Sequence, residues 1–158
     1  MAISINDYLI DQTGIDWQKA FETWLWLIPE EFTIWRVNRI ADCFLVLDDG
    51  AVHMLDVGDG TFQKVAENRG DFENKMDEEE NANNWLAVPL VDQLVETGVQ
   101  LQSGQCYGFR KLPILGGNYT VDNFSPLSLS DYLGAMGSIH EQIKDLPDGS
   151  QVVLKIVE

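Results

Sequence analysis

Carboxylates dominate the side chains of this chain that could do chemistry. Its 158 residues include 26 aspartates and glutamates, against 10 lysines and arginines, two histidines and two cysteines. General acid–base catalysis by carboxylates needs a pair whose surroundings separate their pKa values inside a cleft. Asp56 and Asp59 flank a predicted turn, and Glu141 follows His140 directly. With so many acids close pairs arise by chance, so none is assigned a catalytic role. A small hydrolase that uses a carboxylate pair stays an alternative.

Other catalytic and ligand-binding motifs are lacking. The Gly58-Asp59-Gly60 segment has none of the further residues that a phosphate-binding or dinucleotide-binding loop requires. Two histidines, His53 and His140, without an HExxH motif or paired CxxC motifs, give poor support for a metal site. We expect both histidines to be structural, and Cys43 and Cys106 to be reduced core residues. The sequence predicts no catalytic residue, no metal and no cofactor.

One acidic run is dense enough to suggest a binding role. Between residues 71 and 80, six carboxylates face a single cation, Lys75. Such a run is either a solvated helix end and loop or half of a charge-complementary interface, which speeds encounter and suppresses wrong partners. The candidate partner-binding residues are the six acids of this run: Asp71, Glu73, Asp77, Glu78, Glu79 and Glu80.

The formal charge of −16 is concentrated in the first part of the chain. Residues 1–100 hold 20 acidic and 6 basic side chains, a net charge of −14, whereas residues 101–158 hold 6 and 4, a net charge of −2. Such a field repels nucleic acids and anionic membranes and steers cationic partners toward the surface. It also serves solubility. The charge therefore predicts no direct contact with nucleic acid or membrane, and favours a basic protein as the partner.

Periodicity and turn signals predict an α+β domain. Apolar spacing predicts helices over residues 16–28, 68–76, 84–97 and 128–144, and strands over 33–37, 42–47, 51–56, 61–66, 119–121 and 151–157. The predicted inner helix faces are Trp17, Phe21, Trp24 and Ile28; Leu86, Leu90, Leu94 and Val95; and Tyr132, Met136, Ile139 and Ile143. Helices and strands are segregated along the chain, so we expect an antiparallel sheet, with a central meander plus a C-terminal strand, packed against several helices. The length fits one domain, residues 1–158.

Local signals mark where these elements begin and end. Asp16 and Asn68 are suited to cap helices, and Ser128 with Asp131 forms a capping-box pattern. Asp48-Asp49-Gly50 is typical of a tight hairpin, and Gly98 of a left-handed helix end. Pro147-Asp148-Gly149 is expected to form the turn before the last strand.

The ends of the chain and its hydropathy favour the cytoplasm. The first residues lack the basic region and long apolar run of a signal peptide. No stretch approaches the ~20 apolar residues needed to cross a bilayer. We therefore expect a cytoplasmic protein.

Three groups of segments resemble a known bacterial family. They are residues 139–149 (IHEQIKDLPDG), residues 104–109 (GQCYGF) with 115–119 and 121–123, and residues 48–56 (DDGAVHMLD) with 58–60 and 65–66. Together they are similar to immunity proteins of the type VI secretion system, which protect a cell against a DNase effector delivered by a neighbour. The resemblance implies a cytoplasmic inhibitor of a cognate toxin, with no catalytic residues. It assigns no binding residues, because the shared glycines and turns define the fold.

The charge of the chain agrees with this implied function. A nuclease must attract phosphate, so its cleft is basic, and an acidic inhibitor can occupy that cleft with carboxylates while exposed aromatic side chains anchor the contact. A regulatory scaffold domain that binds other proteins stays the alternative from a different class, beside the small hydrolase.

Overall fold

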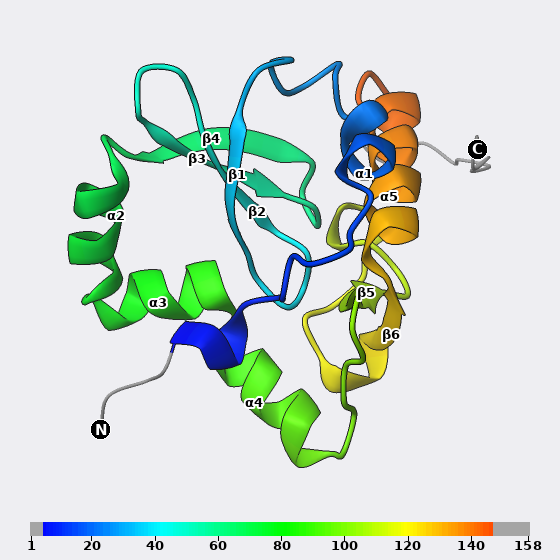
Figure 1. Ribbon diagram of the computed structural model, residues 1–158. Coiled ribbons are helices and arrows are strands. Elements are labelled where there is room, and N and C mark those ends of the chain that lie inside the picture. The colour runs from blue at the N-terminus through cyan, green and yellow to red at the C-terminus, as the bar shows by residue number, and fades with distance from the viewer. Residues whose placement is uncertain (1–4, 147–158) are drawn as a thin grey trace.

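A computed structural model describes residues 5–146, and its elements are shown in Figure 1. The helices are α1 (Trp17–Glu22), α2 (Arg69–Met76), α3 (Glu79–Leu86), α4 (Val88–Glu96) and α5 (Leu129–Ile143). The strands are β1 (Thr33–Val37), β2 (Cys43–Val46), β3 (Val52–Asp56), β4 (Thr61–Ala66), β5 (Gln105–Phe109) and β6 (Phe124–Ser128). Short 3-10 helices occupy Ile5–Tyr8, Pro113–Leu115 and Val121–Asn123. The predicted α+β fold with an antiparallel sheet is confirmed.

The central sheet is a four-stranded antiparallel meander in the order β1-β2-β3-β4. The hairpin between β2 and β3 turns where Asp48-Asp49-Gly50 predicts it, because Gly50 adopts a φ of 85° and the Asp49 carboxylate accepts a hydrogen bond from the Ala51 N–H at 3.0 Å. The three strands predicted within residues 42–66 are present. The strand at residues 33–37 joins them as the outer strand β1.

Side chains on the two faces of this sheet belong to two different cores, as the alternation of a strand requires. Leu45 and Leu55 pack with Trp24 and Leu133, which belong to the α1 segment and α5. On the other face Phe44 and Val52 pack with Phe72 of α2 and Trp85 of α3. Figure 1 shows α1 and α5 side by side at one side of the sheet, and α2 with α3 at the other. The sheet therefore separates the acidic helices α2 and α3 from the α1–α5 pair.

The helix predicted at residues 16–28 is shorter than expected. Asp16 caps it as predicted, but α1 ends at Glu22 and turns follow. Trp24 remains fully buried and its indole N–H donates to the carbonyl of Leu133 at 2.8 Å. Gly137 of α5 permits this approach, because a Cβ there would lie 2.8 Å from the backbone oxygen of Thr23. Tertiary contacts with α5 thus replace the last turns of the predicted helix.

The helix predicted at residues 84–97 is two helices, and Ala87 between them adopts left-handed angles, φ 52° and ψ 43°. Pro89 explains the break, because proline has no N–H to donate to the carbonyl four residues earlier, that of Trp85. Leu90 and Leu94 are buried as predicted. Val95, predicted on the buried side, is 50% exposed, so this prediction was wrong. The restart of the helix after Ala87 directs Val95 away from the core.

The glycine-rich segment after α4 contains strand β5, which was not predicted because glycine weakens the sequence pattern of a strand. Strands β5 and β6 form a separate antiparallel pair. Gly108 lies within β5, where a side chain would not fit, because a Cβ there would come 3.0 Å from the ring of Tyr132. The strand predicted at residues 119–121 was wrong. Asn123 holds this stretch as a loop by donating to the carbonyls of Lys111 and Asn118 at 2.9 and 2.8 Å.

The last described helix, α5, begins at its predicted cap, since the Ser128 hydroxyl accepts from the Asp131 N–H at 3.5 Å. Its buried residues include Tyr132, Ile139 and Ile143, as predicted, whereas Met136 is only partly buried. The turn predicted at residues 147–149 and the strand at 151–157 lie outside the described residues. None of the helices within residues 5–146 is long and apolar enough to cross a membrane.

Asn38 and Asp42 form a buried polar knot that joins three parts of the fold. The Asn38 side-chain oxygen accepts from the N–H groups of Ile40 and Asp42 at 3.1 and 2.9 Å. Its amide donates to the Asp42 carboxylate at 3.2 Å and to the carbonyl of Trp85 at 2.9 Å. The second Asp42 oxygen accepts from the Val57 N–H at 2.9 Å. Pro89 has no N–H to donate to the Trp85 carbonyl, so Asn38 donates to it instead.

Replacing Asn38 with alanine should lower the free energy of unfolding by about 3 kcal/mol, because buried donors at Ile40 and Asp42 and the acceptor at Trp85 lose their partner. Urea unfolding followed by tryptophan fluorescence measures this change. Asn74→Ala on the exposed face of α2 is the matched control and should be close to neutral. Equal stability of the two variants would contradict a stabilising role for the knot.

Candidate partner-binding site

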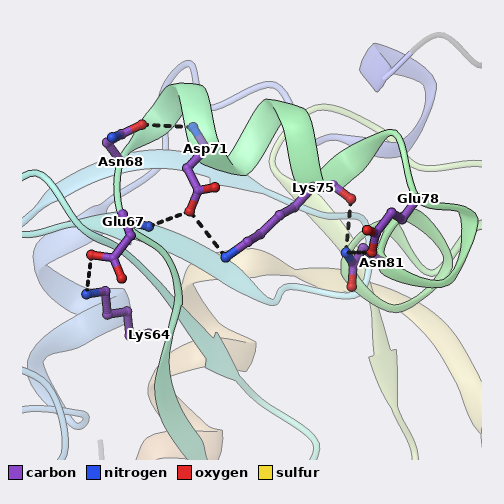
Figure 2. Close-up of polar contacts among 7 residues, drawn as sticks. All are labelled: Lys64, Glu67, Asn68, Asp71, Lys75, Glu78 and Asn81. Carbon is purple, nitrogen blue, oxygen red and sulfur yellow. Dashed lines mark hydrogen bonds and ion pairs between the residues drawn. The ribbon is translucent and has the colours of Figure 1, made fainter.

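The acidic run lies on α2 and the start of α3. Its first member, Asp71, already makes polar contacts within the fold. Asn68 caps α2 by accepting from the Asp71 N–H at 2.8 Å. The Asp71 carboxylate accepts from the Glu67 N–H at 2.9 Å and pairs with Lys75 at 3.2 Å (Figure 2). The hydrogen bond from the Glu67 N–H is the largest cause of the lowered pKa of Asp71, and the contact with Lys75 is the second. Asp71 therefore stays ionised and has a structural partner already.

Glu73 is also neutralised from within the molecule. It forms an ion pair with Arg36, whose guanidinium lies 4.2 Å from the centre of the Trp35 ring. This pair could not be predicted from the sequence, because Arg36 belongs to β1, the outer strand of the sheet. Of the six predicted site residues, Asp71 and Glu73 thus contribute little free charge.

The remaining four carboxylates form a continuous exposed turn, Asp77–Glu80, which we name the acidic turn. Asp77 ends α2 and Glu78 precedes α3, whose first turn holds Glu79 and Glu80. Asn81 fixes the turn, because its amide donates to the Lys75 carbonyl and to the Glu78 carboxylate, both at 3.0 Å (Figure 2).

No lysine or arginine within residues 5–146 pairs with any of the four carboxylates of the acidic turn. Glu79 and Glu80 are favourable in the first turn of α3, where free N–H groups carry partial positive charge. The structure thus gathers the predicted residues on one segment and leaves four of them unpaired. Their binding role stays a prediction.

An open cavity of about 620 Å³ begins at the other end of α3, where the sheet meets α3 and α4. We name it the carboxylate cavity. Its two charged lining residues are Asp42 and Asp56, and Tyr119 stands at its edge with half of its surface exposed. Side-chain amides complete the polar lining: Gln63, Asn83, Asn84 and Gln93.

Burial raises the pKa of both cavity carboxyls. Asp42 is 4% exposed, and desolvation, reinforced by Asp56, raises its pKa well above the usual value. Asp56 is half-buried, and desolvation is again the largest cause of its raised pKa, while N–H groups of Asp59 and Gly58 act in the opposite direction. Both Asp42 oxygens accept internal hydrogen bonds. Asp42 is therefore held within the fold and its raised pKa favours the neutral form, whereas Asp56 has lone pairs left for a ligand.

The two histidines have structural surroundings. His140 is buried, its Nε2 lies 2.7 Å from the carbonyl oxygen of Val57, and burial lowers its pKa. His53 stacks on Phe62 with ring centres 5.0 Å apart. Cys43 and Cys106 are buried and free, as expected of core cysteines. Within residues 5–146, no group of three or more histidine, cysteine or acidic side chains is arranged to hold a metal ion.

Sequence reasoning considered Asp56 with Asp59, but the cavity pairs Asp56 with Asp42. The side chain of Asp59 is exposed, and its backbone N–H donates to the Asp56 carboxylate at 3.0 Å. Asp42 and the amides on α3 and α4 were missed as site residues. The burial of Asp42 depends on its contacts with Asn38 and with Val57, fifteen residues later, which no local pattern in the sequence predicts.

The raised pKa of Asp56 predicts how stability depends on pH. An unfolded aspartate releases its proton near 3.8, whereas folded Asp56 holds it to higher pH. Asp56 therefore favours folding in acid, and that stability is lost as pH rises toward the folded pKa. In Asp56→Asn, the free energy of unfolding relative to the parent should increase as the pH rises above about 4.

Urea unfolding of both proteins across this range measures the difference, with exposed Glu141→Gln as the control for loss of one carboxylate. The other groups near Asp56, namely Asp42, Asp59, His140 and Tyr119, are present in every variant. A difference that stays constant with pH for Asp56→Asn would contradict the assignment.

Comparison with known proteins gives a family match over part of the chain. Residues 66–140 match the family described as type VI secretion immunity protein Tdi1, C-terminal. No curated protein gives a significant match to the chain. The match begins at the last residue of β4 and includes the acidic turn, α3, α4 and most of α5. It confirms the resemblance expected from the sequence. Over residues 66–140, this chain is similar to the type VI secretion immunity proteins of the Tdi1 family.

Proposed function

We propose that this protein neutralises one cognate effector, a DNA-cleaving enzyme, by binding it in the cytoplasm of the cell that makes both. The match of residues 66–140 to the immunity family supports a toxin-binding role. The observation that carries the proposal is the acidic turn, Asp77–Glu80, which lies inside the matched region and whose carboxylates pair with no cation in the described part of the chain. The partner implied by such a surface is basic.

Charge complementarity explains how the acidic turn acts on a nuclease. An enzyme that binds DNA presents lysines and arginines to the phosphates, so its cleft attracts any anionic surface. Four adjacent carboxylates can occupy the positions of substrate phosphates and exclude DNA. Opposite charge also raises the rate of encounter, which matters for an inhibitor that must act before the toxin cleaves the chromosome. The overall charge of −16 strengthens this steering.

An apolar anchor near the charged surface would provide slow dissociation. Tyr119 is the aromatic member of the large apolar side chains that are exposed within residues 5–146, and half of its surface is open to solvent. Phe109 supports it in an edge-to-face contact with ring centres 5.2 Å apart. A rigid, half-exposed tyrosine is typical of interface hot spots.

A hydrolase is the second candidate, because the carboxylate cavity holds two neighbouring acids, and burial raises the pKa of both. Catalysis by a carboxylate pair needs pKa values that are separated. The hydrogen bonds favour a binding role instead. Asp42 uses one oxygen for the Val57 N–H and the other for Asn38, and so holds the fold rather than facing a substrate. Turnover of DNA or of a model ester by the isolated protein, lost in Asp56→Asn, would establish the enzyme.

The proposed function is tested by capture followed by an inhibition assay. The tagged protein is used to retain its partner from the host under conditions that induce secretion, and the retained protein is then purified alone. We expect a basic protein that degrades DNA and loses this activity when one equivalent of the immunity protein is added. A partner with DNase activity that the immunity protein leaves unchanged would overturn the proposal. Retention of housekeeping proteins alone would favour the regulatory scaffold.

Replacing the four acids of the acidic turn with alanine should slow association with the effector by about tenfold and flatten its dependence on salt. The reason is that exposed charges steer the encounter more than they hold the complex. Stopped-flow association at several ionic strengths measures both quantities.

The matched control removes four exposed acids from other parts of the surface: Glu22, Glu96, Glu141 and Asp145. It changes the net charge equally, so it should reduce association only slightly. Equal effects of the two quadruple variants would assign the steering to net charge and remove the acidic turn from the interface.

A further inference from the structure

We propose that the carboxylate cavity receives an arginine side chain of the effector, in addition to the contact made by the acidic turn. This inference rests on the proposed function, because it assigns a second contact to the same partner. The cavity lies at the interface of the sheet with α3 and α4, and its volume of about 620 Å³ can hold an arginine together with neighbouring backbone. Its lining determines which chemistry fits.

Two acids, Asp42 and Asp56, line the cavity, and within residues 5–146 no lysine or arginine belongs to its lining. Burial raises the pKa of both acids and so disfavours their ionised forms. A cationic side chain in the cavity would stabilise these ionised forms. An anion or an apolar side chain would not.

The amides of the cavity point to a ligand with several N–H donors. No hydrogen bond within residues 5–146 involves the side chains of Gln63, Asn83, Asn84 or Gln93, although all four line the cavity. Their carbonyl oxygens, with the free lone pairs of Asp56, offer acceptors in several directions. A guanidinium carries five N–H donors in a plane, whereas an ammonium has three at one point.

Aromatic and apolar groups fit the remainder of an arginine. Tyr119 stands at the edge of the cavity, where its ring can stack on a guanidinium plane. Met54 and Leu90 belong to the apolar part of the lining and can contact the methylene stem. The combination of carboxylate, amide oxygens and a half-exposed ring favours arginine over lysine.

The cavity and the acidic turn lie at opposite ends of the same helix. Glu79 and Glu80 belong to the first turn of α3, whereas Asn83 and Asn84 belong to its second half. At 1.5 Å per residue, these positions are about 6 Å apart along the axis. One basic surface can therefore contact the exposed carboxylates and insert a side chain into the cavity.

The isolated protein tests the cavity without any effector. We expect N-acetyl-arginine amide to produce saturable NMR shifts at the side-chain amides of Asn83 and Asn84 and at the Met54 methyl group, with millimolar affinity. The matched control ligand is N-acetyl-citrulline amide, which keeps the shape and loses the charge, and it should produce no saturable shift. N-acetyl-lysine amide should bind more weakly than the arginine ligand.

Two variants localise the binding. Asp56→Asn keeps an oxygen for the turn and removes the charge, so the arginine shifts should disappear. Asp59→Asn makes the same change three residues away on an exposed side chain outside the lining, and binding should persist. Absence of saturable shifts in the parent protein, equal binding of citrulline, or unchanged binding in Asp56→Asn would each overturn the arginine pocket.

Kinetics with the effector separate the pocket from the proposed function. Asp56→Asn should raise the dissociation rate by at least about tenfold and leave the association rate nearly unchanged, because a buried charge holds the complex rather than steering it. Dissociation that is unchanged while inhibition persists would overturn the pocket and leave the immunity function intact. Loss of the immunity function would instead appear as a DNase that the parent protein does not inhibit.

Discussion

The hydrogen bonds of the Asn38 side chain hold together the parts of the molecule that carry its function. Asn38 lies between β1 and β2, yet it binds the carbonyl at the end of α3 and the carboxylate of Asp42. Asp42 in turn binds the N–H of Val57, just after β3. These groups are buried, so leaving any of them without a partner would cost more than the net value of the bond. The knot therefore fixes the position of α3 relative to the sheet, and with it both the acidic turn and the carboxylate cavity.

Pro89 makes the hydrogen bond from Asn38 to the Trp85 carbonyl necessary. Pro89 cannot donate to the Trp85 carbonyl, so a continuous helix would leave a buried acceptor without a partner. The chain instead changes direction at Ala87, whose left-handed angles cost about 1 kcal/mol, and Asn38 satisfies the freed carbonyl. The bend places Gln93 of α4 and Asn84 of α3 around one cavity. Backbone chemistry at one position thus creates the concave surface.

The elements that the sequence predicted well are those with local causes. Asn68 and Ser128 cap α2 and α5 because their side chains reach N–H groups three residues ahead. The missed features depend on residues far apart in the chain. The end of α1 is set by bonds to α5, and the strand that contains Gly108 depends on its pairing with β6, where Ser125 lies opposite. No window of sequence contains both partners of these contacts.

The same distinction applies to the candidate site. The six carboxylates of the acidic run could be found from the sequence. Which of them lack an internal cation could not, since Glu73 is neutralised by Arg36 from a strand more than thirty residues earlier. Asp42 was placed on a predicted strand and given no role. Its role as a buried carboxyl that holds the fold emerges only when Val57, Asn38 and Asp56 come together around it.

The two acidic features differ in exposure, and this difference gives them different physical roles. The acidic turn is exposed and screened by salt, so it acts at a distance on the encounter. Asp56 lies in a desolvated cavity, where interactions with a cation are stronger but require close contact. The cavity carboxylates belong to residues outside the matched region 66–140, whereas the amides on α3 and α4 belong to it. The arginine contact therefore needs both parts of the chain, and the matched region alone would present the amides of the site without its charge.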